Sequence, residues 1–253
     1  MPFDDQPLNI LYLVWEYPPK LVGGLGTYAT EMTRKFVERG HNVVVFTMNK
    51  RPEEGDPLPT RELYRGVEVH RPLLLDASDI LPSFVADDLR RWGPHIRFFA
   101  DIMLYNILSA SKVVNDLVPR EGRRFDLVVA HDWLSIMGGM LIKKALNIPL
   151  VFHVHSTEHG RMMGGGSAVV KDLEYRGGQV ADMVITVSYA MRQELVSLGF
   201  QEKKIYVCHN GVDPQKYDPT NVDPEEIERL RSEYGIGPDG KMVLFIGRLE
   251  TVK

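Results

Sequence analysis

Short runs of branched apolar residues alternate along this sequence with longer stretches of helical periodicity. A strand without polar alternation is buried on both faces, as in a parallel sheet covered by helices. The alternation therefore predicts the α/β class with a doubly wound, Rossmann-like parallel sheet. The predicted strands are 9–14, 42–47, 126–130, 149–155, 182–188 and 204–208, and the predicted helices between them are 26–39, 134–146, 168–180 and 189–198.

The remaining segments are less regular. Residues 51–60 contain three prolines and several charges, which predicts a loop. Residues 67–71 predict a short strand, and 83–118 predict mostly helix with a break at Gly93-Pro94.

The last part of the chain departs from the alternation. Residues 224–234 predict a surface helix, and 241–247 predict a strand that no helix follows. We interpret 1–209 as one domain and 210–253 as a linker plus the first strand of a truncated second Rossmann-like domain. A lone apolar strand has no sheet of its own, so we expect this part to be poorly packed or to self-associate.

The composition argues against several classes of protein. The net charge is −4 with no basic stripe, which argues against a nucleic-acid partner. The single cysteine, Cys208, rules out an internal disulfide framework. No apolar run approaches the roughly 20 residues of a transmembrane segment. Residues 1–9 carry two aspartates and lack the basic start of a signal peptide, so a cytoplasmic enzyme is expected.

Polar residues gather where the predicted strands end. Ligands of open α/β sheets bind at the carboxyl ends of the strands, so these residues are candidates for one site. They include Gly23 and Gly24 before the first helix, and the residues that follow later strands: His131, Asp132, His155, Glu158, His159, Arg161, Arg248 and Lys253.

The glycine loop at Gly23 and Gly24 precedes a predicted helix N-terminus. Backbone N–H groups there can approach an anion such as a diphosphate, although a tight packing turn is the alternative. The run from Gly24 to Ala29 also matches the dinucleotide fingerprint. However, it lies some ten residues after the strand, and 47–50 hold no acid for a ribose, which argues against a nicotinamide-binding reductase.

The histidines raise a metal-dependent alternative. His153 and His155 lie on one face of a predicted strand, and His159 follows in the next loop. A metal-dependent hydrolase built on these three residues is one rival hypothesis, but the spacing misses known metallohydrolase loops by one residue. We therefore predict no metal, with His153 in the core and His155 at the mouth of the site.

His131 and Asp132 stand at the end of a strand. Asp132 is expected to cap the following helix through its carboxylate, which leaves His131 free to hydrogen-bond a sugar hydroxyl. Arg248 directly follows a strand and a glycine. With Lys253 it could stabilise the negative charge on a leaving nucleoside diphosphate.

Seven motifs in order resemble one family. They are Glu16-Tyr-Pro-Pro19 with Gly23-Gly24-x-Gly26, Arg39-Gly40-His41-x-Val43, His131-Asp132-Trp133, 154–158, Thr186-Val187-Ser188, 210–213, and Gly247-Arg248-Leu249 with Lys253. Together they cover almost the whole chain. The chain resembles the GT-B fold glycosyltransferases, specifically the retaining group 1 and glycogen synthase-like type of families 4 and 5.

The resemblance implies two Rossmann-like domains that face a cleft, the first binding the acceptor and the second the nucleotide sugar. It implies that His131 contacts the transferred sugar, and that the donor phosphates lie against Gly23, Gly24, Arg248 and Lys253. It places Glu158 and Arg161 on the acceptor side, where we also expect Asp132 and His155. The implied reaction is a retaining hexosyl transfer from UDP-glucose or ADP-glucose to a sugar or glucan, without a cofactor or an essential metal.

Two departures limit the resemblance. Glycogen synthases carry a lysine two residues before the paired glycines, where this chain has Leu21. The acidic motif of the second domain would lie beyond Lys253, so we expect the fragment to be inactive alone. A non-catalytic sugar-binding module is a further alternative, which would bind acceptor equally well without Arg248 and Lys253.

Overall fold

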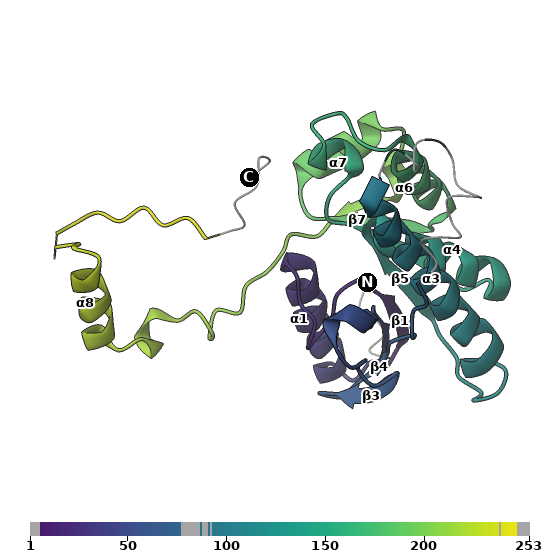
Figure 1. The fold of residues 1–253 in the computed structure, drawn as a ribbon, viewed down its shortest axis with the longest axis horizontal. Coiled ribbons are helices and arrows are strands. Elements are labelled where there is room, and N and C mark those ends of the chain that lie inside the picture. The colour runs from purple at the N-terminus through teal and green to yellow at the C-terminus, as the bar shows by residue number, and fades with distance from the viewer. Residues whose placement is uncertain (1–5, 77–86, 88–90, 92, 238, 247–253) are drawn as a thin grey trace. The chain divides into compact units, whose positions relative to one another are not determined.

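The computed structural model describes residues 6–76, 87, 91, 93–237 and 239–246 (Figure 1). Two compact units divide the chain, Met1–His209 and Asn210–Lys253. Arg248 and Lys253 lie outside the described residues.

An eight-stranded sheet forms the centre of the first unit, in the order β3-β4-β2-β1-β5-β6-β7-β8. Neighbouring strands are parallel except for β3 and β4. The order changes direction between β1 and β5, as in doubly wound sheets, and the predicted fold class is confirmed. The strands are β1 Asn9–Leu13, β2 Asn42–Phe46, β3 Arg61–Tyr64, β4 Val67–His70, β5 Leu127–His131, β6 Leu150–Val154, β7 Met183–Thr186 and β8 Ile205–Val207.

Helices cover both faces of the sheet (Figure 1). Along β1, Ile10 and Tyr12 pack in the same cluster as Ala29 of α1, whereas Leu11 and Leu13 pack with Tyr105 of α3 on the opposite face. The helices of this unit are α1 Gly24–Glu38, α3 Ile96–Lys112, α4 Asp132–Leu146, α5 Glu158–Arg161, α6 Ala168–Val180 and α7 Tyr189–Ser197, with the short helical turns Pro52–Glu54, Gly93–His95, Val113–Leu117 and Glu202–Lys204. No helix in the described part is both long and apolar enough to cross a membrane.

Most predicted elements are present, with one omission. The helix predicted over 26–39 begins two residues earlier, and Gly40 follows it in a left-handed conformation at φ 86°. The break at Gly93-Pro94 is confirmed as a 3-10 turn before α3, although part of 83–118 lies outside the described residues. Strand β3 was missed because its residues are half-exposed or exposed at the edge of the sheet, so they lack the apolar composition of a buried strand.

The second unit contains α8 Pro224–Glu233, close to the predicted surface helix, and the 3-10 turn Pro219–Asn221. The strand predicted over 241–247 is wrong for its described part, since 241–246 form no strand. A strand requires a neighbour to complete its backbone hydrogen bonds, and here Val243 is 99% and Ile246 is 85% exposed.

Helix α6 packs closely because two glycines allow it. A Cβ atom on Gly177 would lie 2.4 Å from Cγ1 of Ile136, and one on Gly178 would lie 2.3 Å from Cε1 of Phe200. We expect Gly177→Ala to lower the free energy of unfolding by about 1–3 kcal/mol, because overpacking forces core side chains out of their rotamers.

Chemical denaturation would measure this loss. Gly24→Ala is the matched control, since Gly24 is also helical and its added methyl group would meet no atom of the described residues within 4 Å. Equal stability of the two variants would contradict the packing argument.

Candidate functional site

A cluster of aromatic and imidazole rings lies at the point where the order of the strands reverses. His131 ends β5 and pairs in register with His153 of β6. Both lie on the face of the sheet covered by α1, whose Tyr28 contacts three histidine rings, with centroids 5.1 Å from His153 and 4.8 Å from His155. From β1, the ring of Tyr12 lies 4.3 Å from that of His131. Tyr28 was not predicted as a site residue, because its position within the predicted helix 26–39 gave no signal of this contact.

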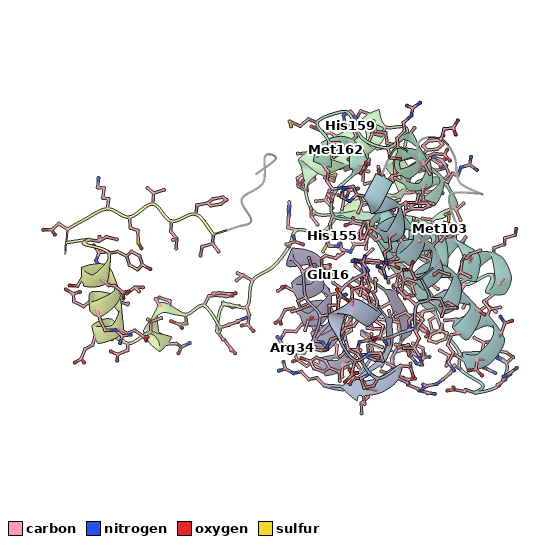
Figure 2. All side chains as sticks on the ribbon, viewed as in Figure 1. Glu16, Arg34, Met103, His155, His159 and Met162 are labelled. Atoms are coloured by element: carbon pink, nitrogen blue, oxygen red, sulfur yellow. The ribbon has the colours of Figure 1, made fainter. Side chains whose placement is uncertain are left out.

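Two of the histidines are directly linked. Nδ1 of His131 and Nε2 of His155 are 3.0 Å apart, within hydrogen-bond distance. Within the described residues, Nε2 of His131 and Nε2 of His153 are buried without a hydrogen-bond partner. The structure thus brings two of the predicted site residues, His131 and His155, into contact. Figure 2 labels His155 and Glu16, which both lie near one end of α1.

Burial keeps these imidazoles neutral. It lowers the pKa of His131 well below its ordinary value, and the neighbouring His153 and His155 lower it further. It also lowers the pKa of His153 to about 2 and lowers that of His155, although the Asp132 carboxylate opposes the shift at His155. Near neutral pH each ring carries one proton, so each has one donor and one acceptor nitrogen.

The same cluster bears on the metal alternative. The structure groups His131, rather than His159, with His153 and His155, and their candidate ligand nitrogens lie within 4.8 Å of one another. Zinc bonds of about 2.0–2.1 Å in a tetrahedral site would bring such nitrogens to roughly 3.4 Å. The rings would have to close around an ion, and the hydrogen bond between His131 and His155 would be lost.

Asp132 does not cap α4, so that prediction is wrong. Among the residues that the structure describes, no side-chain hydrogen bond caps this helix, and Asp132 has φ 51° in the left-handed region. Its Oδ1 instead accepts from the backbone N–H groups of His155, at 2.7 Å, and Ser156, at 3.3 Å. Asp132 thus fixes the loop that follows β6, and burial raises the pKa of its carboxyl group.

Removing this acceptor should loosen the loop. We expect Asp132→Ala to lower the free energy of unfolding by about 1–3 kcal/mol, because two backbone N–H groups lose their partner. Asp132→Asn keeps an acceptor oxygen and tolerates positive φ, so it should retain most of the stability.

Thermal and denaturant unfolding of the two variants would measure the difference. Proteolysis after Arg161 offers a local readout, and it should be faster only for Asp132→Ala. An equal loss in both variants would mean that the negative charge, rather than the acceptor, is what matters.

The predicted acceptor residues Glu158 and Arg161 are the first and last residues of α5, which Glu174 of α6 holds in place. Glu174 is 4% exposed and accepts from the backbone N–H of Glu158 at 2.9 Å. Nη2 of Arg161 lies 3.2 Å from carboxylate oxygens of both Glu158 and Glu174, and its Nη1 donates to Oγ of Ser156 at 2.8 Å. The sequence analysis missed Glu174, because nothing in the helical pattern of 168–180 marks this glutamate as buried.

The glycine loop is occupied by a carboxylate of the protein itself. Oε2 of Glu16 accepts from the backbone N–H of Val22 at 2.6 Å and of Gly23 at 2.7 Å. A Cβ atom on Gly26 would lie 3.0 Å from the same oxygen and 2.6 Å from Leu21, which explains the glycine there. Gly23 is the N-cap of α1 and Gly24 is its first residue, although both were predicted to precede the helix, and the N–H of Gly23 already has an anionic partner.

Curated proteins similar to this chain are glycosyltransferases. An uncharacterized glycosyltransferase of Methanocaldococcus jannaschii is 30% identical over 97% of this chain and 57% of its own length. The glycogen synthase of Mycobacterium tuberculosis is 29% identical over 97% of this chain and 55% of its own length. The chain thus spans little more than half the length of these relatives.

Solved structures with the same fold are GT-B glycosyltransferases. Sucrose-phosphate synthase of Thermosynechococcus elongatus has a TM-score of 0.61 at 15% identity, over 92% of this chain and 53% of its own. Anabaena HepE in complex with UDP and glucose has a TM-score of 0.56 at 17% identity, over 90% of this chain and 50% of its own.

The sequence profile of Glycosyltransferase Family 4 matches residues 22–216, which include the glycine loop, the histidine cluster and α5 with Glu174. The resemblance inferred from the motifs is therefore confirmed, and the chain belongs to glycosyltransferase family 4.

Proposed function

We propose that the protein is a retaining hexosyltransferase that moves a glucose-like sugar from a UDP-linked or ADP-linked donor to a sugar or glucan acceptor. The first unit supplies the acceptor side. The observation that carries the proposal is the buried Nε2 of His131, which has no hydrogen-bond partner among the described residues and lies where the strand order reverses. Ligands of doubly wound sheets bind at that point.

The relatives support a nucleotide-sugar substrate. Similar proteins are named as glycogen synthase and alpha-maltose-1-phosphate synthase, and the HepE structures contain UDP, glucose or UDP-glucose. Neutral, buried imidazoles suit hydrogen bonding to uncharged sugar hydroxyl groups. No finding supports a metal-dependent hydrolase.

The remaining roles are proposals of the same kind. Arg248 and Lys253 contact the donor phosphates, residues 210–253 lead into the nucleotide-sugar domain, and the enzyme works in the cytoplasm without an essential metal. His155, Glu158 and Arg161 face the acceptor. The exposed apolar segment 241–246 packs against further protein, either a complete second domain or another copy of the chain.

Donor turnover tests the function. The full-length protein would be incubated with UDP-glucose or ADP-glucose, with a glucan or simple sugars, and the release of nucleoside diphosphate followed with and without EDTA. Release that depends on acceptor and survives EDTA supports the proposal and identifies the base. Folded protein that releases nothing from either donor, yet binds glucan in calorimetry, would point to a sugar-binding module instead.

A further inference from the structure

The hydrogen bond between His131 and His155 restricts where each ring carries its proton. Both rings are neutral, and the contact joins Nδ1 of His131 to Nε2 of His155. A hydrogen bond needs one proton between the two nitrogens. Because each neutral ring carries one proton, the direction of this hydrogen bond decides whether Nε2 of His131, on the opposite side of the ring, is protonated or bare.

Two arrangements satisfy this condition. If Nδ1 of His131 donates, its Nε2 is an acceptor and His155 carries its proton on Nδ1. If Nε2 of His155 donates, then Nε2 of His131 is a donor and Nδ1 of His155 is bare. In the first arrangement Nε2 of His131 can accept a hydrogen bond from the proposed sugar, and in the second it can donate one.

The carboxylate of Asp132 distinguishes between them. Asp132 accepts from the backbone N–H of His155 at 2.7 Å, and Nδ1 of His155 is fewer bonds from that N–H group than Nε2, the nitrogen that contacts His131. This carboxylate also acts electrostatically on the His155 ring. A protonated Nδ1 on His155 is attracted to it, whereas a bare nitrogen lone pair is repelled.

We propose that His155 is a positioning residue that holds His131 in the tautomer with a proton on Nδ1 and a bare Nε2. The buried Nε2 of His131 then accepts a hydrogen bond from a hydroxyl group of the bound sugar. Asp132 favours the tautomer of His155 that is protonated on Nδ1. The bare Nε2 of His155 then accepts a hydrogen bond from Nδ1 of His131, which fixes the tautomer of His131. The tautomer assignment rests on the hydrogen bonds of His131 and His155 and on the charge of Asp132, while its role in turnover rests on the proposed function.

Imidazole nitrogen NMR tests the assignment without any substrate. In the protein labelled with ¹⁵N at histidine, long-range proton–nitrogen spectra at pH 7 should show His131 protonated on Nδ1 and bare on Nε2. His155→Leu removes the acceptor, so the two tautomers of His131 should become comparably populated. His155→Gln offers an amide oxygen in the same region and should restore the wild-type pattern. His159→Leu is the control, since His159 is outside the histidine cluster.

Turnover provides the second readout. His155→Leu should lower kcat by about tenfold or more, as expected for a wrongly protonated imidazole, while His155→Gln should recover most of it. Amide spectra would confirm that each variant is folded. If either variant fails to fold, the tautomer of His131 in the wild-type protein still decides the assignment.

The outcomes separate the two proposals. A wild-type His131 protonated on Nε2, or a His155→Leu variant with an unchanged His131 tautomer, would overturn the role of His155. The predicted tautomers in a protein without transferase activity would leave that role intact and refute the proposed function.

Discussion

Replacing His131 with alanine should reduce kcat for sugar transfer by about 10²–10³, the range found when one polar contact to a transition state is lost. His131 is fully buried, and its Nε2, which has no hydrogen-bond partner in the described part of the chain, lies at the reversal point of the sheet. A sugar hydroxyl that meets alanine there would lose its partner in a site from which water is largely excluded, where such contacts are worth most.

Steady-state kinetics with the full-length protein would measure this effect. His159→Ala is the matched control, because His159 lies in the neighbouring α5 but outside the histidine cluster. His131→Ala also leaves a cavity, so its folding must be checked by circular dichroism. A folded His131→Ala enzyme with wild-type kcat would exclude a role for His131 in the reaction.

The second large effect is a pH dependence of stability that originates at Glu174. Burial raises the pKa of this carboxyl from 4.5 to about 7, against the opposing effect of Arg161. A raised pKa in the folded state means that the stabilising contribution is complete below about pH 4.5 and is lost as the pH rises through about 7. The shift corresponds to about 3 kcal/mol at 1.36 kcal/mol per pH unit.

We therefore expect the free energy of unfolding of the wild-type protein to fall between pH 5 and pH 8 relative to that of Glu174→Gln, by up to about 3 kcal/mol. Glutamine keeps an acceptor for the backbone N–H of Glu158 but cannot ionise. Urea titrations at several pH values would show the difference. Glu228→Gln, at an exposed position of α8, should leave the pH profile unchanged. If the free energies of unfolding of wild type and Glu174→Gln changed in parallel with pH, ionisation of Glu174 would not affect the stability.

The sheet could be predicted because its strands carry their signal in composition. Strands buried on both faces, such as β5 and β6, are apolar apart from one histidine each, and the helix between them fixes the parallel connection. The edge strand β3 carries no such run, and the apolar segment 241–246 carries it without forming a strand. Pairing depends on a neighbour, which composition does not reveal.

The site was predicted less completely, for a related reason. That His131 and His155 lie close together could be predicted, because residues at the ends of parallel strands meet at one edge of the sheet. Asp132 was placed correctly but given the wrong partner, because its positive φ turns the side chain from its own helix to the loop after β6. Glu174 lies 16 residues from the backbone group that it binds, and no local pattern encodes that distance.

The carboxylate of Glu16 in the glycine loop has a consequence for ligand binding. Flexible loops lose conformational entropy when they close around a ligand, and this loss weakens the observed affinity. Here Glu16, close after the end of β1, already ties down the backbone at Val22 and Gly23. The loop before α1 is thus preorganised by a carboxylate of the protein, in place of the anion that the loop was expected to bind. A phosphate group must either bind the remaining backbone N–H groups or compete with Glu16 for those of Val22 and Gly23.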